Sequence, residues 1–294
     1  RVMKLAIIGC GEVGRLYAAA AAPHFELVLC DAYPSAAAQE LAEQLGVELK
    51  SSIGPWLADM DRVWACVTGD VAVSVAEQAS AHTSPGALYA DLSTANSADK
   101  RKAAELLEAK SAEYVDVAIM GAVGLTGVRT NLLAAGPDAA SAVKDFGKLG
   151  APARALDNAA AGDAIALKLL RTVLTKGLEA LGVEALIAAE SQGVRAELYR
   201  VLEDIDTEGF TNFLNAVVRT HVLHAERRFH EVDRAIAQLD EAGLPSSVLA
   251  GTRERYEQTV QALKDSAPAP GTAENIDSAV SWLLESSQAA KATA

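Results

Sequence analysis

A glycine-rich turn near the start of the chain constrains the fold more than any other feature. An apolar run over residues 4–8 leads directly into a G-x-G-x-x-G pattern, and a helical pattern follows. Gly9 permits a tight turn from strand to helix, Gly11 lets a pyrophosphate approach the backbone, and Gly14 lets the helix pack closely on the sheet. The helix N-terminus offers free N–H groups to the phosphates. The pattern predicts a strand–turn–helix unit that binds a dinucleotide.

A carboxylate closes the next apolar run. Residues 26–30 end on Asp31, which lies 20 residues after Gly11. A carboxylate at this spacing accepts hydrogen bonds from the adenosine ribose hydroxyls. Because it repels a 2′-phosphate, we expect NAD in preference to NADP. The residues predicted to bind the cofactor here are Gly9, Cys10, Gly11, Glu12, Val13, Gly14 and Asp31.

Composition excludes several classes of partner. The net charge is −13 and no broad basic patch is evident, which argues against nucleic acid and anionic membranes. No apolar run reaches transmembrane length, and the first strand begins at once, so we expect neither a membrane span nor a signal peptide. Three widely spaced cysteines predict no disulfide framework and favour the cytoplasm.

The order of patterns predicts two domains. Up to about residue 156, short apolar runs alternate with helical patterns, which indicates βαβ units and a parallel sheet. After Gly162 one long helix is expected over about 162–190, and the remainder is helical in pattern. We therefore predict an α/β fold: a nucleotide-binding domain with a doubly wound (Rossmann) sheet over 1–158, then an all-helical substrate and dimerisation domain over 159–294. The expected strands are 4–8, 26–30, 62–67, 87–92, 113–119, 131–135 and 152–156.

Several segments in this order resemble the β-hydroxyacid dehydrogenase family. They are the glycine turn, Asp-Leu-Ser-Thr at 91–94, Asp-Val-Ala-Ile-Met-Gly at 116–121 and Gly-Asp-Ala-Ile-Ala-Leu-Lys at 162–168. The family includes 3-hydroxyisobutyrate dehydrogenase, tartronate semialdehyde reductase and, more distantly, 6-phosphogluconate dehydrogenase. The helical half is most similar to a poorly characterised bacterial branch of 6-phosphogluconate-dehydrogenase-like proteins, through residues 168–171, 175–181 and 224–228. Because the helical half of such proteins is often completed by a partner, we expect a homodimer.

The resemblance implies a catalytic role for Lys168. In the family, a lysine at this place in the interdomain helix exchanges a proton with the substrate oxygen while hydride moves to or from nicotinamide. Such chemistry needs a group that donates a proton to a developing alkoxide or takes one from an alcohol. A solvated lysine is the alternative, but the segment 166–170 around Lys168 is otherwise apolar.

Two positions depart from the family pattern. The family usually has an asparagine four residues after the lysine, where this chain has Thr172, which reaches less far. Met120 replaces a serine of the family's substrate loop, and Gly121 follows it. A bulkier or more apolar substrate is therefore expected, with Met120, Gly121 and Thr172 among the residues that contact it.

Other candidates follow the strands and the long helix. Val67 and Thr68 close one strand and are expected beside the cofactor, or else they form only a turn. Ser93 and Thr94 end the next strand, where they contact substrate and nicotinamide or merely cap a helix. Arg171, one turn after Lys168, binds substrate or pairs with an acid.

A polar cluster over 221–231 is the last candidate. Arg227 and His230 are expected to hold an anionic substrate group, and a solvated helix face is the alternative. His221 and His224 are three residues apart, but no acid or cysteine completes a ligand set, so no metal is expected.

The sequence thus predicts an NAD(P)-dependent oxidoreductase that acts on the alcohol or carbonyl of a small hydroxyacid-like substrate. Two alternatives stay open. One is an imine-reducing enzyme of the same architecture, although such relatives tend to lack the lysine. The other is a dinucleotide-binding sensor without catalytic activity.

Overall fold

The chain forms two compact units. A computed structural model describes residues 1–293 and divides the chain into Arg1–Val173 and Leu174–Ala294. The division falls within the long helix α7 (Asp163–Ser191). The predicted domain boundary between residues 158 and 159, ahead of this helix, stays a prediction.

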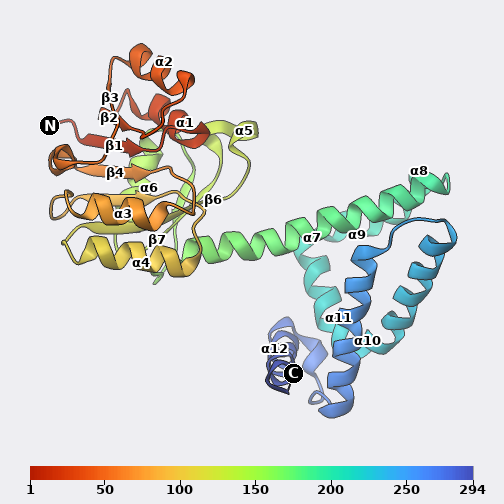
Figure 1. The fold of residues 1–294 in the computed structure, drawn as a ribbon. Helices are drawn as coiled ribbons and strands as arrows, with labels where there is room; N and C mark the ends of the chain where they lie inside the picture. Colours follow the sequence, from red (N-terminus) through yellow and green to blue (C-terminus); the bar gives the residue numbers. More distant parts are fainter. Residues whose placement is uncertain (294) are drawn as a thin grey trace. The chain divides into compact units, whose positions relative to one another are not determined.

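The first unit is built on an eight-stranded sheet, which confirms the predicted α/β class (Figure 1). The strand order is β3-β2-β1-β4-β5-β6-β7-β8, and all neighbouring pairs are parallel except β6 and β7. The strands are β1 (Lys4–Ile8), β2 (Glu26–Cys30), β3 (Glu48–Lys50), β4 (Arg62–Ala65), β5 (Leu88–Asp91), β6 (Glu113–Ile119), β7 (Leu132–Ala135) and β8 (Ala153–Ala155).

Two details of the sheet differ from the sequence prediction. Strand β3 was not expected, because its three residues are half-exposed and carry no apolar run. Strand β7 is antiparallel to β6, whereas the alternation of patterns predicted a wholly parallel sheet. Between β6 and β7 lies only the short helix α5 (Val123–Thr126) with a following turn, so the chain returns without a full crossover helix.

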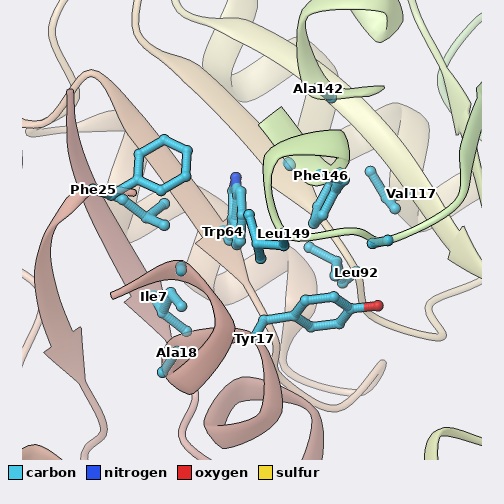
Figure 2. Packing of buried hydrophobic residues seen from close by; sticks show 14 of the residues in the cluster. Ile7, Tyr17, Ala18, Phe25, Trp64, Leu92, Val117, Ala142, Phe146 and Leu149 are labelled. Carbon is cyan, nitrogen blue, oxygen red and sulfur yellow. The ribbon is translucent and has the colours of Figure 1, made fainter. Parts of the chain in front are cut away.

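Helices cover both faces of the sheet. Buried residues of α1 (Glu12–Ala21), α2 (Ala36–Leu45) and α6 (Ala139–Lys148) pack on one face, and those of α3 (Ala72–Ser80) and α4 (Ser97–Glu108) pack on the other. Figure 2 shows the first layer, where Trp64 of β4 stacks on Phe146 with ring centroids 4.5 Å apart. Alternate residues of each strand enter opposite layers, so each βα unit buries apolar side chains on both sides.

The second unit is helical, as predicted. Among the described residues it contains the C-terminal part of α7 followed by five α-helices, of which α10 is the longest. They are α8 (Arg195–Val201), α9 (Glu203–Glu208), α10 (Phe210–Glu241), α11 (Ser247–Asp265) and α12 (Ile276–Thr293). None of the helices in the described part of the chain has the length and apolar character needed to cross a membrane.

Candidate active site

The glycine turn has the geometry that its sequence predicts. Gly9 has φ +89°, and a Cβ there would lie 2.6 Å from the carbonyl oxygen of Cys66. A Cβ on Gly14 would lie 1.8 Å from the carbonyl oxygen of Gly9, so only glycine permits α1 to approach the turn this closely. A Cβ on Gly11 would meet nothing within 4 Å. The turn is thus tight at its two ends and open at Gly11, the position predicted to face a pyrophosphate.

The first turn of α1 is available to an anion. Its N-cap residue is Gly11, so no side chain caps the helix, and Glu12 and Val13 follow at its start. Arg15 donates a hydrogen bond to the carbonyl oxygen of Cys10 at 3.0 Å, and the backbone N–H of Gly9 donates to Cys30 at 2.8 Å. Burial raises the pKa of the Cys10 thiol to about 12. Cys10 therefore contributes backbone and packing rather than a thiolate.

Asp31 is held against the glycine turn by its own hydrogen bonds. One carboxylate oxygen accepts from the backbone N–H of Cys10 at 2.7 Å, and the other accepts from Tyr33 at 2.9 Å. Each oxygen retains a free lone pair, so the carboxylate is able to accept ribose hydroxyls as well. The ring of Tyr33 is 94% exposed beside this carboxylate. These residues, with the open position at Gly11, fit the adenosine half of a dinucleotide.

The ends of β4 and β5 meet beside the glycine turn. A Cβ on Gly9 would lie 2.9 Å from the side chain of Val67, and one on Gly69 would lie 2.8 Å from the backbone nitrogen of Ala95. Thr68 and Thr94 are both exposed in these loops. The structure therefore brings the predicted residues Val67, Thr68 and Thr94 to the same edge of the sheet as the glycine turn. Their contact with a cofactor stays a prediction.

Ser93 lies inside the protein. Its side chain is 2% exposed, its Oγ accepts from the backbone N–H of Ala95 at 3.3 Å, and its own N–H donates to Asp91 at 2.8 Å. These bonds favour a structural role over direct contact with substrate, which is the alternative that the sequence left open.

A buried charge cluster lies where the last residue of β5, Asp91, pairs with Asp116 in the middle of β6. The ammonium of Lys100 in α4 lies 3.1 Å from a carboxylate oxygen of Asp91 and 3.1 Å from one of Asp116. All three side chains are at most 1% exposed. The hydroxyl of Tyr114 donates to the other oxygen of Asp91 at 2.8 Å. Lys100 and Tyr114 were missed by the sequence analysis, because a lysine in a helix is usually solvated.

Helix α7 begins directly above this cluster. The second oxygen of Asp116 accepts hydrogen bonds from the backbone N–H groups of Gly162 and Ile165, each at 3.1 Å. Ser97 of α4 donates to the carbonyl oxygen of Gly162 at 2.9 Å. The first turn of α7 is thereby fixed to β6 and α4, and a carboxylate near its N-terminus is favourable to the helix dipole.

Lys168 projects from the next turn of α7. Its side chain is half-buried, and burial lowers its pKa below the usual 10.5, with a further lowering from the positive charge of Lys100. Thr172 donates from its hydroxyl to the carbonyl oxygen of Lys168 at 3.0 Å, and Arg171 is exposed on the same helix. An amine that is easier to deprotonate than usual is suited to exchange a proton.

Met120 and Gly121 follow β6. Met120 packs against the small buried cluster of Ala118, Ala135 and Ala164, the last of which lies in the first turn of α7. Gly121 is exposed, and a Cβ there would lie 3.1 Å from Thr130. The loop then approaches the glycine turn, since a Cβ on Gly124 would lie 3.4 Å from the carboxylate of Glu12.

The remaining candidates lie on α10 in the second unit. Arg227 forms an ion pair with Glu231 at 2.8 Å, and His230 is exposed beside Phe229. Their role in substrate binding stays a prediction. Burial, with Arg255 and Arg228 nearby, lowers the pKa of His221 to about 4, and this ring bonds the hydroxyl of Thr259. No group of three metal-binding side chains occurs in the described part of the chain.

Comparison with known proteins defines the class to which this site belongs. Residues 4–175 match the model of the NAD binding domain of 6-phosphogluconate dehydrogenase, which is more than half of the chain. The chain therefore belongs to this family, which confirms the resemblance inferred from the sequence. Residues 189–259 match a domain of unknown function, DUF1932.

Solved structures are similar over most of the chain. A conserved hypothetical protein from Sinorhizobium meliloti 1021 is 25% identical, with a TM-score of 0.60 and coverage of 97% of each chain. A conserved protein of unknown function, described as structurally similar to 3-hydroxyacid dehydrogenases, is 26% identical, with a TM-score of 0.61 over 88% of this chain and 98% of that one. The fold is an NAD-binding, hydroxyacid-dehydrogenase-like fold.

A second kind of enzyme shares this fold. An imine reductase from Aspergillus terreus, in complex with NADPH4 and a dibenzazepine, is 20% identical, with a TM-score of 0.72 over 88% of this chain and 94% of that one. At this identity the likeness concerns the fold alone. Family and fold together indicate an NAD(P)-dependent oxidoreductase.

Proposed function

We propose that the protein transfers hydride between a nicotinamide cofactor and the alcohol or carbonyl group of a small hydroxyacid-like substrate. The observation that carries this proposal is the placement of Lys168. It is half-buried one turn after the point where Asp116 fixes α7 to the sheet, and its pKa is lowered. An amine in this state gives up its proton more readily than an ordinary lysine, so it is suited to serve both as acid and as base.

The proton moves through Lys168 in either direction. A bound nicotinamide supplies or accepts the hydride. In reduction, the Lys168 ammonium donates a proton to the substrate oxygen as negative charge develops on it. In oxidation, the neutral amine takes the hydroxyl proton. Thr172 stands where the family has an asparagine, and its bond to the carbonyl oxygen of Lys168 occupies its hydroxyl proton.

Asp31 supports NAD as the cofactor used. Its carboxylate is fixed by Cys10 and Tyr33, so it keeps its place where the adenosine ribose binds. A 2′-phosphate would meet this charge at short range, which disfavours NADP.

Met120 supports a more apolar substrate than the family's usual one. It packs on Ala164 of α7 and offers a thioether where a serine would offer a hydroxyl. We propose Gly121, Arg171, Arg227 and His230 as further substrate-binding residues, as the sequence predicts.

The apolar side chains of α7 support a homodimer. Leu169, Leu170, Val173 and Leu178 are 47%, 64%, 74% and 52% exposed. Large apolar side chains exposed along one helix are a feature that a partner surface would cover. Light scattering at micromolar concentration is expected to give the dimer mass, and a monomer would contradict it.

We also propose a cytoplasmic location. All three cysteines are unpaired in this structure, and a reducing compartment keeps them so.

The test is Lys168→Ala, assayed with a panel of hydroxyacids, sugar acids and aromatic alcohols by NADH absorbance. Turnover is expected to fall by about 10²–10⁴-fold, because that is the usual contribution of a positioned acid or base. NADH affinity is expected to stay nearly unchanged. Lys176→Ala is the matched control, since Lys176 lies on the same helix, exposed and paired with Glu179. Unchanged turnover in Lys168→Ala would remove the catalytic role.

Imine reduction is the second candidate, favoured by the fold shared with the imine reductase. An iminium ion already carries its proton, so its reduction needs no acid. Turnover of cyclic imines that survives in Lys168→Ala would support this candidate. If the protein binds NADH but turns over no substrate of the panel, a dinucleotide-binding sensor without catalytic activity is the remaining alternative.

A further inference from the structure

Lys100 is a buried cation that the proposed reaction does not use. Its side chain is fully buried, and its ammonium donates to the carbonyl oxygen of Asp91 at 2.7 Å as well as to the Asp91 carboxylate. Ionised lysine is almost never fully buried unless it is paired. A buried ion pair is not in itself evidence of stability, because desolvation offsets most of the attraction. Stability alone therefore does not explain why Lys100 is buried.

The cluster is connected to α7 through Asp116. One oxygen of Asp116 holds the N–H groups of Gly162 and Ile165. Among the described residues its other oxygen accepts no hydrogen bond, and it faces the Lys100 ammonium at 3.1 Å. Lys100 thus fixes the carboxylate that holds the first turn of α7, and Lys168 is three residues beyond Ile165.

We propose that Lys100 is a positioning residue for Lys168. Through Asp116 it sets where the Lys168 side chain leaves the helix, and it presents a second positive charge to that amine. The inference rests on the proposed role of Lys168 as acid and base. A lysine beside another cation loses its proton more easily, which is one established way to activate an amine.

The charged groups near the first two turns of α7 come from the sheet, from α4 and from α7 itself. A carboxylate oxygen of Asp163 accepts a hydrogen bond from the backbone N–H of Ala160 at 2.8 Å. Burial is the larger cause of the lowered pKa of Lys168, and the Lys100 charge adds to it in the same direction. The groups concerned are Asp91 and Asp116 on the sheet, Lys100 and Arg101 on α4, and Asp163 and Arg171 on α7.

Two substitutions separate positioning by charge from simple disruption. Lys100→Met removes the cation and keeps the length of the side chain. Asp116→Asn keeps an oxygen for Gly162 and Ile165 but removes the negative charge opposite Lys100. The readout is the reactivity of Lys168 toward a limiting amount of acetic anhydride at several pH values, measured by mass spectrometry. This readout needs no turnover.

The two variants are expected to shift the pKa and the reactivity of Lys168 in opposite directions. In Lys100→Met the positive charge that lowers the pKa of Lys168 is lost, so this pKa rises and the reactivity of Lys168 at fixed pH falls. In Asp116→Asn the Lys100 charge is opposed by Asp91 alone, so it lowers the pKa of Lys168 further and increases the reactivity. Lys148→Met is the control and leaves Lys168 unchanged, because Lys148 pairs with Asp145 on α6.

Several outcomes would overturn the inference. Mere disruption would expose Lys168 in both variants and lower its reactivity in both, so shifts of the same sign contradict a specific role for Lys100. Absence of any shift contradicts it as well. If Lys100→Met does not fold, Asp116→Asn decides alone, and unchanged or reduced reactivity refutes the inference. Suppose that Lys168→Ala keeps full turnover while Lys100→Met and Asp116→Asn still shift the reactivity of Lys168 in opposite directions. The proposed function then fails, but the effect of Lys100 on Lys168 is confirmed.

Discussion

The ends of two strands in the same sheet are built in different ways. At the end of β1 the working groups are backbone atoms: three glycines shape the turn, and the start of α1 has no side-chain cap. At the end of β5 the working groups are buried charges, with Lys100 between Asp91 and Asp116 of the neighbouring strand β6. The first end is suited to bind a phosphate by shape and dipole. The second is suited to hold a titrating amine at a chosen position.

The two strand ends therefore tolerate different kinds of substitution. A backbone site fails when an added atom occupies its space, whatever the charge of that atom. A charge cluster fails when one charge is removed, even if the shape is kept, because an unpaired buried charge is costly. Steric variants therefore probe the end of β1, and isosteric neutral variants probe the end of β5.

The largest effect that tests this contrast is expected at Gly14. In Gly14→Ala the new Cβ would lie 1.8 Å from the carbonyl oxygen of Gly9, so α1 must move away from the turn. We expect a loss on the order of 3 kcal/mol in the free energy of unfolding, as for overpacked cores, and loss of NADH binding. Denaturant unfolding and cofactor fluorescence measure the two effects.

Gly11→Ala is the matched control for the steric argument. Its Cβ would meet no protein atom within 4 Å, and its φ of −69° suits alanine. Stability is expected to change little, while NADH affinity falls about tenfold or more because the methyl group stands where the pyrophosphate approaches. Equal losses of stability in the two variants would contradict the distinct roles of the two glycines.

The pH dependence of turnover tests the charged end. Oxidation needs neutral Lys168, so kcat/KM should rise about tenfold per pH unit and level off once the pH exceeds the pKa of this amine. Because burial and Lys100 lower that pKa, the plateau should begin below pH 10.5. Reduction needs the ammonium, so its rate should fall over the same interval.

The same profile in Lys168→Ala decides which group is titrating. This dependence should be absent from the variant. A plateau that begins only at pH 10.5 or above, or a variant that keeps the profile, would show that another group controls the rate.

The sequence predicted the strands around the glycine turn, but neither the pairing of distant strands nor the buried charge cluster. The strands that bear the glycine turn and Asp31 were predicted at their observed bounds, because apolar runs and glycines are local signals. Strand β3 and the antiparallel direction of β7 were not predicted, since strand pairing depends on partners distant in sequence.

The charge cluster could not be read from the sequence for the same reason. Lys100 follows Asn96 in an ordinary polar first turn of α4, and nothing local distinguishes it from a solvated lysine. Its burial depends on Asp91 and Asp116, which only the parallel pairing of β5 and β6 brings together. Lys168 itself was found through the family resemblance rather than through any pattern in its helix.

The smallest expected effect concerns cofactor choice and sharpens the role of Asp31. Asp31→Asn removes the charge but retains one oxygen for the backbone N–H groups of Cys10 and Tyr33, so the turn should remain folded. The ratio of NADPH to NADH affinity is expected to rise about tenfold, which corresponds to about 1.4 kcal/mol of relieved repulsion. Fluorescence titration with both cofactors measures it. Glu26→Gln, at the opposite end of β2, removes an equal charge far from the turn and should leave the ratio unchanged. A ratio that shifts equally in both variants would mean that the overall charge of the protein, rather than the carboxylate at Asp31, discriminates against the 2′-phosphate.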